Sequence, residues 1–226
     1  MATPETPNPA PTPNRPAPNR PAPNRTDRRR AKTRQALIDA ARTLIADGRA
    51  ATVSIADITA TADVGFGTFY NHFDDKKSLF DAAIDQILEA LGDHLDTIAT
   101  RAIDPAEVFA TSFRHAGRLA ISHRQTAEII DSYGFVLMGS PTGLGPRARR
   151  DLADAVAAGR LRIENIDLAT AITCGHLLAL VHAWLADPVS VTDADVDASL
   201  ETLLRSFGMA AVTARRLAHR DLLSID

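Results

Sequence analysis

The sequence predicts an all-α protein, and two observations carry this prediction. Beyond residue 32, apolar residues recur three and four positions apart, as they do on one face of a helix. No segment shows the sustained two-residue alternation of a half-buried strand. The clearest break is SPTGLGP at 140–146, which is rich in helix-breaking residues. We therefore expect a short N-terminal three-helix domain followed by a larger helical domain.

Composition favours a cytoplasmic protein whose two ends differ in charge. The chain has 226 residues, 45% of them apolar, which is enough for a substantial core. The single cysteine excludes an internal disulfide framework, and the proline-rich N-terminus lacks the apolar run of a secretory signal. Residues 1–80 carry 12 basic and 8 acidic residues, whereas residues 81–226 carry 13 and 20. Such asymmetry suits a protein that places one end on a polyanion.

Residues 1–30 are predicted to form a disordered tail rich in proline and arginine. The pentad P-x-P-N-R occurs three times in tandem within 11–25, and such a sequence favours extended polyproline II rather than a core. The arginines of this repeat run into a further basic cluster that continues to Arg34. Two interpretations stay open, namely a solvated tail without a specific role and an arm that touches DNA phosphates.

Helices are expected in order along the rest of the chain. An amphipathic helix starts near Lys32 and ends at Gly48. Thr52 or Ser54 offers an N-cap for a short helix that runs to about Thr61. A second short helix follows. The later helices are expected near 77–100, 105–123, 125–137, 146–158, 166–186 and 193–218.

Residues 52–80 are the most informative segment, because they indicate two short helices, a tight turn between them and the start of a third helix. Gly65, Gly67 and Thr68 have small side chains or none, so the backbone of the second short helix can approach bases and phosphates closely. The free N–H groups at the start of that helix also favour phosphate. The segment is therefore typical of a helix-turn-helix that presents a helix end to double-stranded DNA.

The spacing within this segment also resembles one known family. The residues that carry the match are Thr52, Ile55, Ala56, Ala62, Val64, Gly67, Thr68, Tyr70, His72, Phe73, Lys76 and Leu79. At these positions the chain resembles the DNA-binding domain of the TetR family of transcriptional regulators over residues 31–80. The resemblance implies a homodimeric repressor that binds a palindromic operator and releases it when a small molecule enters residues 81–226.

The resemblance also implies roles for individual residues. One set would contact DNA phosphates, and its members are Thr52, Ser54, Tyr70, His72 and Lys76. A second set would face the major groove, and its members are Gly65, Phe66, Gly67, Thr68 and Asn71.

Three positions depart from the family pattern. Asp63 stands where glycine is usual in the turn, and aspartate tolerates positive φ better than most residues, so we expect the turn to be kept. Thr59 replaces an alanine, which is a mild packing change. Phe66 stands where a small or polar residue is common. Its ring either contacts thymine methyl groups or folds against the protein or the DNA backbone, and both interpretations stay open.

Residues 168–186 contain no Asp, Glu, Lys or Arg and approach the length of a membrane span. We reject a membrane span because both flanks are acidic, the stretch holds polar side chains, and no second span accompanies it. A helix that is apolar nearly all round is buried in protein instead. We expect it to form a subunit interface of a homodimer, with 193–218 as its partner.

No catalytic constellation, metal site or cofactor motif is evident, so we do not expect an enzyme. The histidines and Cys174 are better read as core or interface residues. An effector pocket is expected among the middle helices, and a mainly apolar lining favours a hydrophobic effector. The candidate lining residues are Phe109, Phe113, Tyr133, Met138 and Thr173.

Two other functions remain as alternatives. A helical carrier or enzyme could use the apolar cavity for its own purpose and keep the N-terminal module by descent only. An architectural DNA binder could use the arginine-rich arm without sequence preference.

Overall fold

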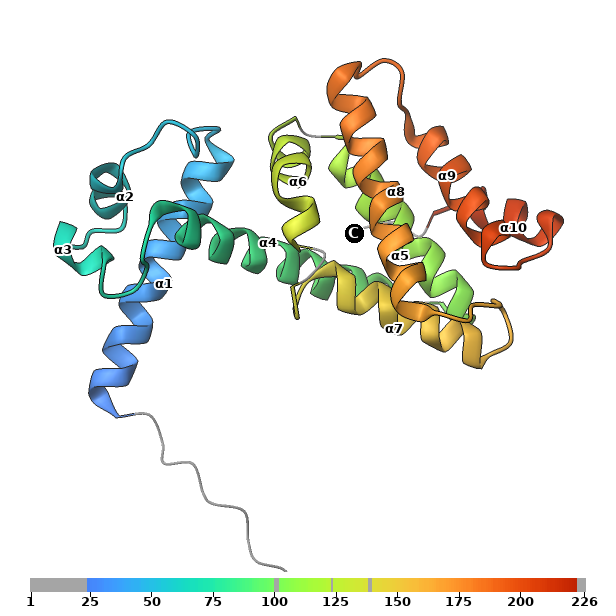
Figure 1. Ribbon diagram of the computed structural model, residues 1–226, viewed down its shortest axis with the longest axis horizontal. Coiled ribbons are helices and arrows are strands. Elements are labelled where there is room, and N and C mark those ends of the chain that lie inside the picture. Colours follow the sequence, from blue (N-terminus) through green and yellow to red (C-terminus); the bar gives the residue numbers. More distant parts are fainter. Residues whose placement is uncertain (1–23, 100–101, 123, 138–139, 223–226) are drawn as a thin grey trace, which may run out of the picture.

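The computed structural model describes residues 24–99, 102–122, 124–137 and 140–222, and all the regular elements among them are helices (Figure 1). This confirms the all-α prediction. The helices are α1 (Arg25–Ala46), α2 (Ile55–Thr61), α3 (Phe66–Phe69), α4 (Lys76–Ala99), α5 (Pro105–Ala120), α6 (Arg124–Leu137), α7 (Leu144–Ala157), α8 (Ile166–Ala186), α9 (Asp193–Ser206) and α10 (Ala211–Ala218).

The first helix begins earlier than the sequence predicts. We expected a disordered tail to residue 30, but α1 starts at Arg25 because Asn24 and Asp27 form a capping box. The Asp27 amide donates to the Asn24 side chain at 2.9 Å, and the Asn24 amide donates to the Asp27 carboxylate at 3.3 Å. Reciprocal caps of this kind satisfy the free N–H groups of a helix end. The predicted tail at 1–23 lies outside the described residues.

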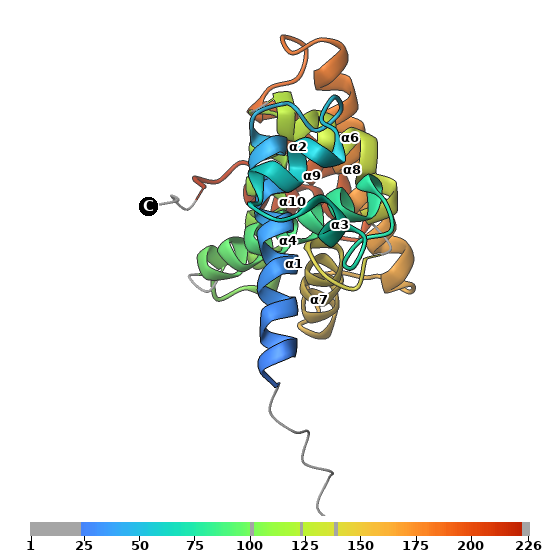
Figure 2. The same ribbon diagram turned by 90° about the vertical axis from the view of Figure 1, so that its left-hand side faces the viewer.

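Helices α1 to α3 and the first half of α4 form the N-terminal domain. Figure 2 shows this domain in front of the helical bundle, with α1 running past α2 and α3. Its core includes Ile38 of α1, Ile58 of α2 and Phe69 of α3, all fully buried. Ala83 and Ile84 of α4 belong to the same cluster, so the core passes the boundary that we predicted after residue 80.

Helix α4 joins the two domains. Beyond Ile84, its buried residues Leu95 and Ile98 pack with Ala116 of α5 in a separate cluster. One continuous helix therefore contributes buried residues to the cores of both domains. In Figure 1 it runs from the N-terminal domain into the bundle formed by α5 to α10.

The C-terminal domain is built around α5, most of whose residues are buried. Phe109 and Phe113 of α5 pack with Leu200, Leu203 and Leu204 of α9 in the largest core cluster. The apolar side of α9 is thus buried within its own chain. This corrects the expectation that this side would pair with a second subunit.

A buried ion pair fixes α5 against α9. Arg114 Nε donates to Asp197 at 2.7 Å, and the two side chains are only 5% and 10% exposed. Arg118 Nη2 approaches the same carboxylate at 2.9 Å. Arg114 also donates to the carbonyl of Arg220 at 2.8 Å, which ties the segment after α10 to the bundle. The carboxylate of Asp197 therefore holds two cations at once.

The expected helix at 193–218 is divided into α9 and α10. Gly208 has a φ of 83°, in the region that favours glycine, and it ends α9. A Cβ at this position would lie 2.9 Å from Cβ of Arg162. The Arg162 amide donates to the carbonyl of Phe207 at 2.8 Å, so the break allows a close backbone approach.

The expected helix at 146–158 instead begins at Leu144. Gly143 precedes it with a φ of 81°, and Pro146 lies in the first turn of α7. Proline is tolerated there because the N–H groups of a first turn have no partner within the helix. The predicted break therefore marks the start of a helix as well as a loop.

The buried ion pair predicts a large loss of stability when Asp197 is removed. Asp197→Ala leaves the Arg114 guanidinium buried without its counter-ion, which costs on the order of 3–5 kcal/mol. Asp193→Ala is the matched control, because Asp193 is 61% exposed and pairs with Arg118 at 3.4 Å. That exposed pair contributes less than about 1 kcal/mol. Urea unfolding midpoints that fall equally in the two variants would contradict this assignment.

Candidate nucleic-acid interface and internal cavities

The helix-turn-helix is held by local caps and one unusual backbone angle. Ser54 caps α2 and accepts from the Asp57 amide at 3.2 Å, while its amide donates to the Asp57 carboxylate at 2.9 Å. The Ser54 hydroxyl also donates to the Asp57 carboxylate at 2.7 Å, and the hydrogen bonds that this carboxylate accepts from the Ser54 amide and hydroxyl lower the pKa of Asp57. After α2, Asp63 adopts a φ of 53°, the only positive φ outside glycine in the described residues. The turn predicted at Asp63 is therefore confirmed.

Helix α3 presents two aromatic rings to solvent. Phe66 and Tyr70 are each 54% exposed, and their rings meet edge-on with centroids 6.0 Å apart. Phe69, between them, is fully buried and holds α3 on the domain core. Phe66 thus rests against Tyr70 and still offers most of its ring to a partner, which leaves both interpretations of this residue open.

Gly67 has no evident role in packing within the chain. A Cβ added to Gly67 would meet no atom within 4 Å, and φ at this position is not positive. Neither backbone conformation nor crowding explains why a glycine stands here. The helix surface around Gly67 is left bare, so an external backbone can approach it closely.

A basic surface adjoins α3. Arg29 and Arg30 of α1, together with Asn71 and His72, line an open hollow of about 430 Å³. Arg30 Nη2 donates to the carbonyl of Asn71 at 3.4 Å. Burial, and then the charges of Arg30 and Arg34, lower the pKa of His72. His72 is therefore neutral near pH 7, and it can donate a hydrogen bond without adding a positive charge.

Lys76 makes contacts within the chain that we did not predict. Its ammonium donates to three backbone carbonyls, those of Ala50, Ala51 and Val53, at 3.3, 3.2 and 3.0 Å. A lysine has three N–H groups, so these bonds leave none for a phosphate. In the described structure the ammonium is engaged by these carbonyls, and the phosphate contact of Lys76 stays a prediction. The side chain ties the α1–α2 loop to the start of α4.

The other predicted DNA-contacting residues are all at least partly accessible on the N-terminal domain. Thr52, Ser54, Gly65, Phe66, Gly67, Tyr70 and Asn71 are exposed, and Thr68 and His72 are half-buried. The sequence analysis missed Arg29 and Arg30 as parts of a folded surface, because it placed both in the tail. Asn24 and Asp27 were the available signal, since they form the motif of a capped helix.

A cavity of about 40 Å³ lies inside the C-terminal domain, and most of its lining surface is apolar. Of the predicted lining residues, Phe109, Phe113 and Thr173 all border it. The side chain of Tyr133 and the whole of Met138 lie outside the described residues. The cavity also has a charged side that we did not predict, formed by Asp96, Arg147 and Asp151, with Ser112 beside it.

The charged side belongs to a network between α4 and α7. Arg147 donates to Glu89 at 3.0 Å and to Asp96 at 2.9 Å, and it also pairs with Asp93. Arg150 bridges Asp96 and Asp151 at 2.6 and 2.8 Å. Hydrogen bonds to Glu89 and Asp96 raise the pKa of Arg147, so its guanidinium stays positively charged. Burial raises the pKa of Asp151, despite the nearby Arg150.

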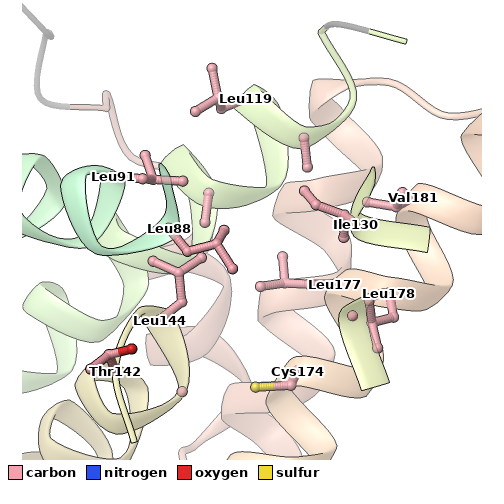
Figure 3. Close-up of a pocket in the computed structure, with 14 residues that line it drawn as sticks. Leu88, Leu91, Leu119, Ile130, Thr142, Leu144, Cys174, Leu177, Leu178 and Val181 are labelled. Atoms are coloured by element: carbon pink, nitrogen blue, oxygen red, sulfur yellow. The ribbon is translucent and has the colours of Figure 1, made fainter. Parts of the chain in front are cut away.

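A second and larger cavity, of about 90 Å³, lies next to the first (Figure 3). Leu88 and Leu91 of α4 border it, facing Leu177, Leu178 and Val181 of α8. Nearly all of its lining is apolar. Both leucines fall at the helical spacing of apolar residues in α4, but such periodicity alone does not distinguish a cavity wall from filled core.

Helix α8 has an apolar face that its own chain does not cover. Leu168 and Ile172 are 57% and 40% exposed, and Ala179 and Ala183 continue the same face. A Cβ added at Gly175, on this face, would meet no atom within 4 Å. By length and composition, α8 is the one described helix that could cross a membrane, which by itself is weak evidence for a span.

The histidines are engaged in hydrogen bonds rather than gathered together. His176 lies 3.0 Å from Ser199, and His182 lies 3.0 Å from Asp131. Within the part of the chain that the structure describes, no group of three or more His, Cys, Asp or Glu residues is arranged to hold a metal ion.

Two regions of the chain match known family models. Residues 37–83 match the model described as bacterial regulatory proteins, tetR family. Residues 104–220 match the model described as tetracyclin repressor-like, C-terminal domain. Together these matches cover both the helix-turn-helix and the domain that holds the cavities.

Individual proteins are also similar to this chain. A HTH-type transcriptional repressor of Mycobacterium tuberculosis is 30% identical over 152 residues, which are 66% of this chain and 70% of the relative. The crystal structure of RolR in complex with its ligand resorcinol is 40% identical, with a TM-score of 0.77, over 88% of this chain and 99% of that chain. RolR without ligand is 39% identical, with a TM-score of 0.73, over 85% and 100%.

The position of Lys76 predicts a loss of domain stability in Lys76→Ala. Three charge-assisted hydrogen bonds disappear, and three carbonyls lose their donor, so we expect a cost of about 2–3 kcal/mol. Lys77→Ala is the matched control, because Lys77 forms an exposed pair with Asp81 that contributes about 0.5 kcal/mol. Chemical denaturation of both variants measures the difference. Equal stability of the two variants would restore a phosphate contact as the main role of Lys76.

Proposed function

Because the chain belongs to the TetR family of DNA-binding transcriptional regulators, we propose that it is a dimeric repressor whose effector is a small phenol of the resorcinol type. The DNA-binding module is the observation that carries this function. An exposed four-residue helix stands on a buried phenylalanine, with a bare glycine at its surface and arginines beside it. Such a module is suited to present a helix end to DNA.

In this proposal the DNA face is divided between two kinds of contact. Thr52, Ser54, Tyr70 and His72 hydrogen-bond phosphates, and Arg29 and Arg30 add positive charge next to them. The surface from Gly65 to Thr68, with Asn71, lies toward the major groove. Lys76 acts indirectly, by holding the loop that carries Thr52. Phosphate contacts fix the position of the domain on the duplex, while groove contacts select the sequence.

The dimer is proposed to form through the exposed face of α8. Small and apolar residues at spacings of three and four along this face allow two copies of the helix to pack closely. A two-fold axis would bring the same surface from both subunits together. The dimer would then match an operator with the same two-fold symmetry, which is a palindrome. The exposed face of α9, which is the polar one, would lie at the margin of this contact. The two recognition helices then need a separation of roughly 34–36 Å to enter successive major grooves.

The effector is proposed from the charged and aromatic residues that border the smaller cavity and from the likeness to RolR. Asp96 and Asp151 can accept hydrogen bonds from phenolic hydroxyl groups. Phe109 and Phe113, with ring centroids 6.4 Å apart, provide an aromatic wall. A ring that carries two hydroxyl groups matches this arrangement of polar and aromatic side chains.

Binding of such a ring must enlarge the cavity. Its volume is about 40 Å³, whereas an engineered cavity that binds benzene has on the order of 150 Å³. The walls that have to separate include Asp96 on α4 and Arg147 on α7. Because α4 continues into the N-terminal domain, the liganded state would hold the recognition helices at a different separation. An effector that binds this state better shifts the population away from DNA.

Selection from a random DNA pool is the first test of this function. We expect a single palindrome, and Gly67→Ala should weaken binding to it more than tenfold, because a methyl group would separate α3 from the duplex. Glycine to alanine in a helix stabilises by up to about 1 kcal/mol, so the variant stays folded. Broad enrichment without a palindrome would indicate an architectural binder, and no enrichment would indicate a carrier.

Release by resorcinol is the second test. Resorcinol should dissociate the protein from the selected palindrome, and Asp151→Asn should raise the concentration required by about 10- to 100-fold, the range for a hydrogen bond to a charged group. Asp154→Asn is the matched control, because Asp154 is exposed on the same helix and does not border the cavity. Equal responses of the two variants, measured by fluorescence anisotropy of labelled DNA, would remove Asp151 from the effector site.

A further inference from the structure

The two cavities are neighbours, and only the smaller one is bordered by charged residues. Ala116, Leu144 and Leu177 border both of them, so the compartments are separated by only three apolar side chains. The smaller compartment has the charged groups of α4 and α7 on its wall. The larger one, about 90 Å³, has only Thr142 and Cys174 as lining residues with polar side-chain atoms.

The larger compartment is already open in the described structure, whereas the smaller one must widen to accept a ring. Figure 3 shows leucines of α4, α7 and α8 directed toward a common space, with the Cys174 sulfur on its lower side. Apolar cavities of this kind stay dry and take up apolar groups. Resorcinol carries no apolar substituent, so it would leave this space unused.

We propose that the larger compartment is a subsite for an alkyl substituent on the phenolic effector. The preferred effector is then an alkylated dihydroxybenzene, with its hydroxyl groups at the charged side and its chain among the leucines. This inference rests on the proposed function, because the smaller compartment must hold the ring. At roughly 30 Å³ for each water-sized group, the subsite accommodates a chain of about three carbons.

The subsite also has a way out toward the surface. Gly145 and Cys174 border both the larger compartment and a surface hollow that contains Arg149 and Asp167. A longer chain can pass between these two residues and reach solvent. Carbons beyond the third therefore add little apolar burial, and the gain in affinity reaches a plateau instead of reversing.

The experiment compares resorcinol with its methyl, propyl and pentyl derivatives, alkylated at position 4 in one series and at position 5 in the other. Isothermal titration calorimetry on the full chain measures each affinity. In at least one series, affinity should rise about fourfold per methylene up to propyl, the ratio that corresponds to about 0.8 kcal/mol per buried methylene. Pentyl should differ from propyl by less than threefold.

Filling the subsite provides the matched variants. Cys174→Leu should reduce the ratio of propyl-resorcinol affinity to resorcinol affinity to near one. Ala171→Leu, one turn earlier on α8, borders only the surface hollow and should keep the wild-type ratio. Ala120→Val fills the same compartment from α5 and replaces Cys174→Leu if that variant has a lowered thermal midpoint.

The outcomes separate the two proposals. If resorcinol binds but neither alkyl series gains affinity, the subsite is overturned and the proposed effector class stands. If no phenol in either series binds, both proposals fail together. If the gain persists in both filled variants, the chain does not occupy this compartment and the subsite is again overturned.

Discussion

The arrangement of this protein depends on the charged contact between α4 and α7. Arg147 is only 16% exposed and faces three carboxylates of α4, those of Glu89, Asp93 and Asp96. A guanidinium in such a place is costly to leave unpaired, so α7 cannot move away from α4 without finding new partners. The contact therefore permits a small number of discrete arrangements rather than a continuous range. The smaller cavity lies at this contact, and Asp96 and Arg147 belong to both.

Much of the fold could be predicted from periodicity and caps, and the exceptions have local causes. Helices α2 and α8 have the predicted bounds, because Ser54 and Asn165 cap them where the apolar pattern begins. The division of 193–218 was missed, since a pattern of apolar residues continues on both sides of Gly208. A glycine inside a helical pattern costs little by itself, and only the approach of Arg162 shows that the chain must turn there.

The candidate site was less predictable, because it depends on contacts distant in sequence. Family spacing identified the exposed residues of α3, and it also assigned Lys76 to phosphate. The ammonium instead binds carbonyls 23 to 26 positions earlier, which no local pattern reveals. Likewise, Phe109 and Thr173 could be placed near a cavity by their helices. The carboxylate of Asp151 could not, since a charged residue on an amphipathic helix is expected to face solvent.

The continuity of α4 has a mechanical consequence. Its 24 residues make a rod of about 36 Å, at roughly 1.5 Å per residue. The helix is uninterrupted between its two buried ends, so a rotation at Asp96 also turns the end at Lys76. A tilt of about 5° over that length moves the far end by roughly 3 Å. In a symmetric dimer the displacements of the two N-terminal domains add. A change in cavity width that is much smaller than the effector therefore moves the two recognition helices away from the separation that the pitch of DNA requires.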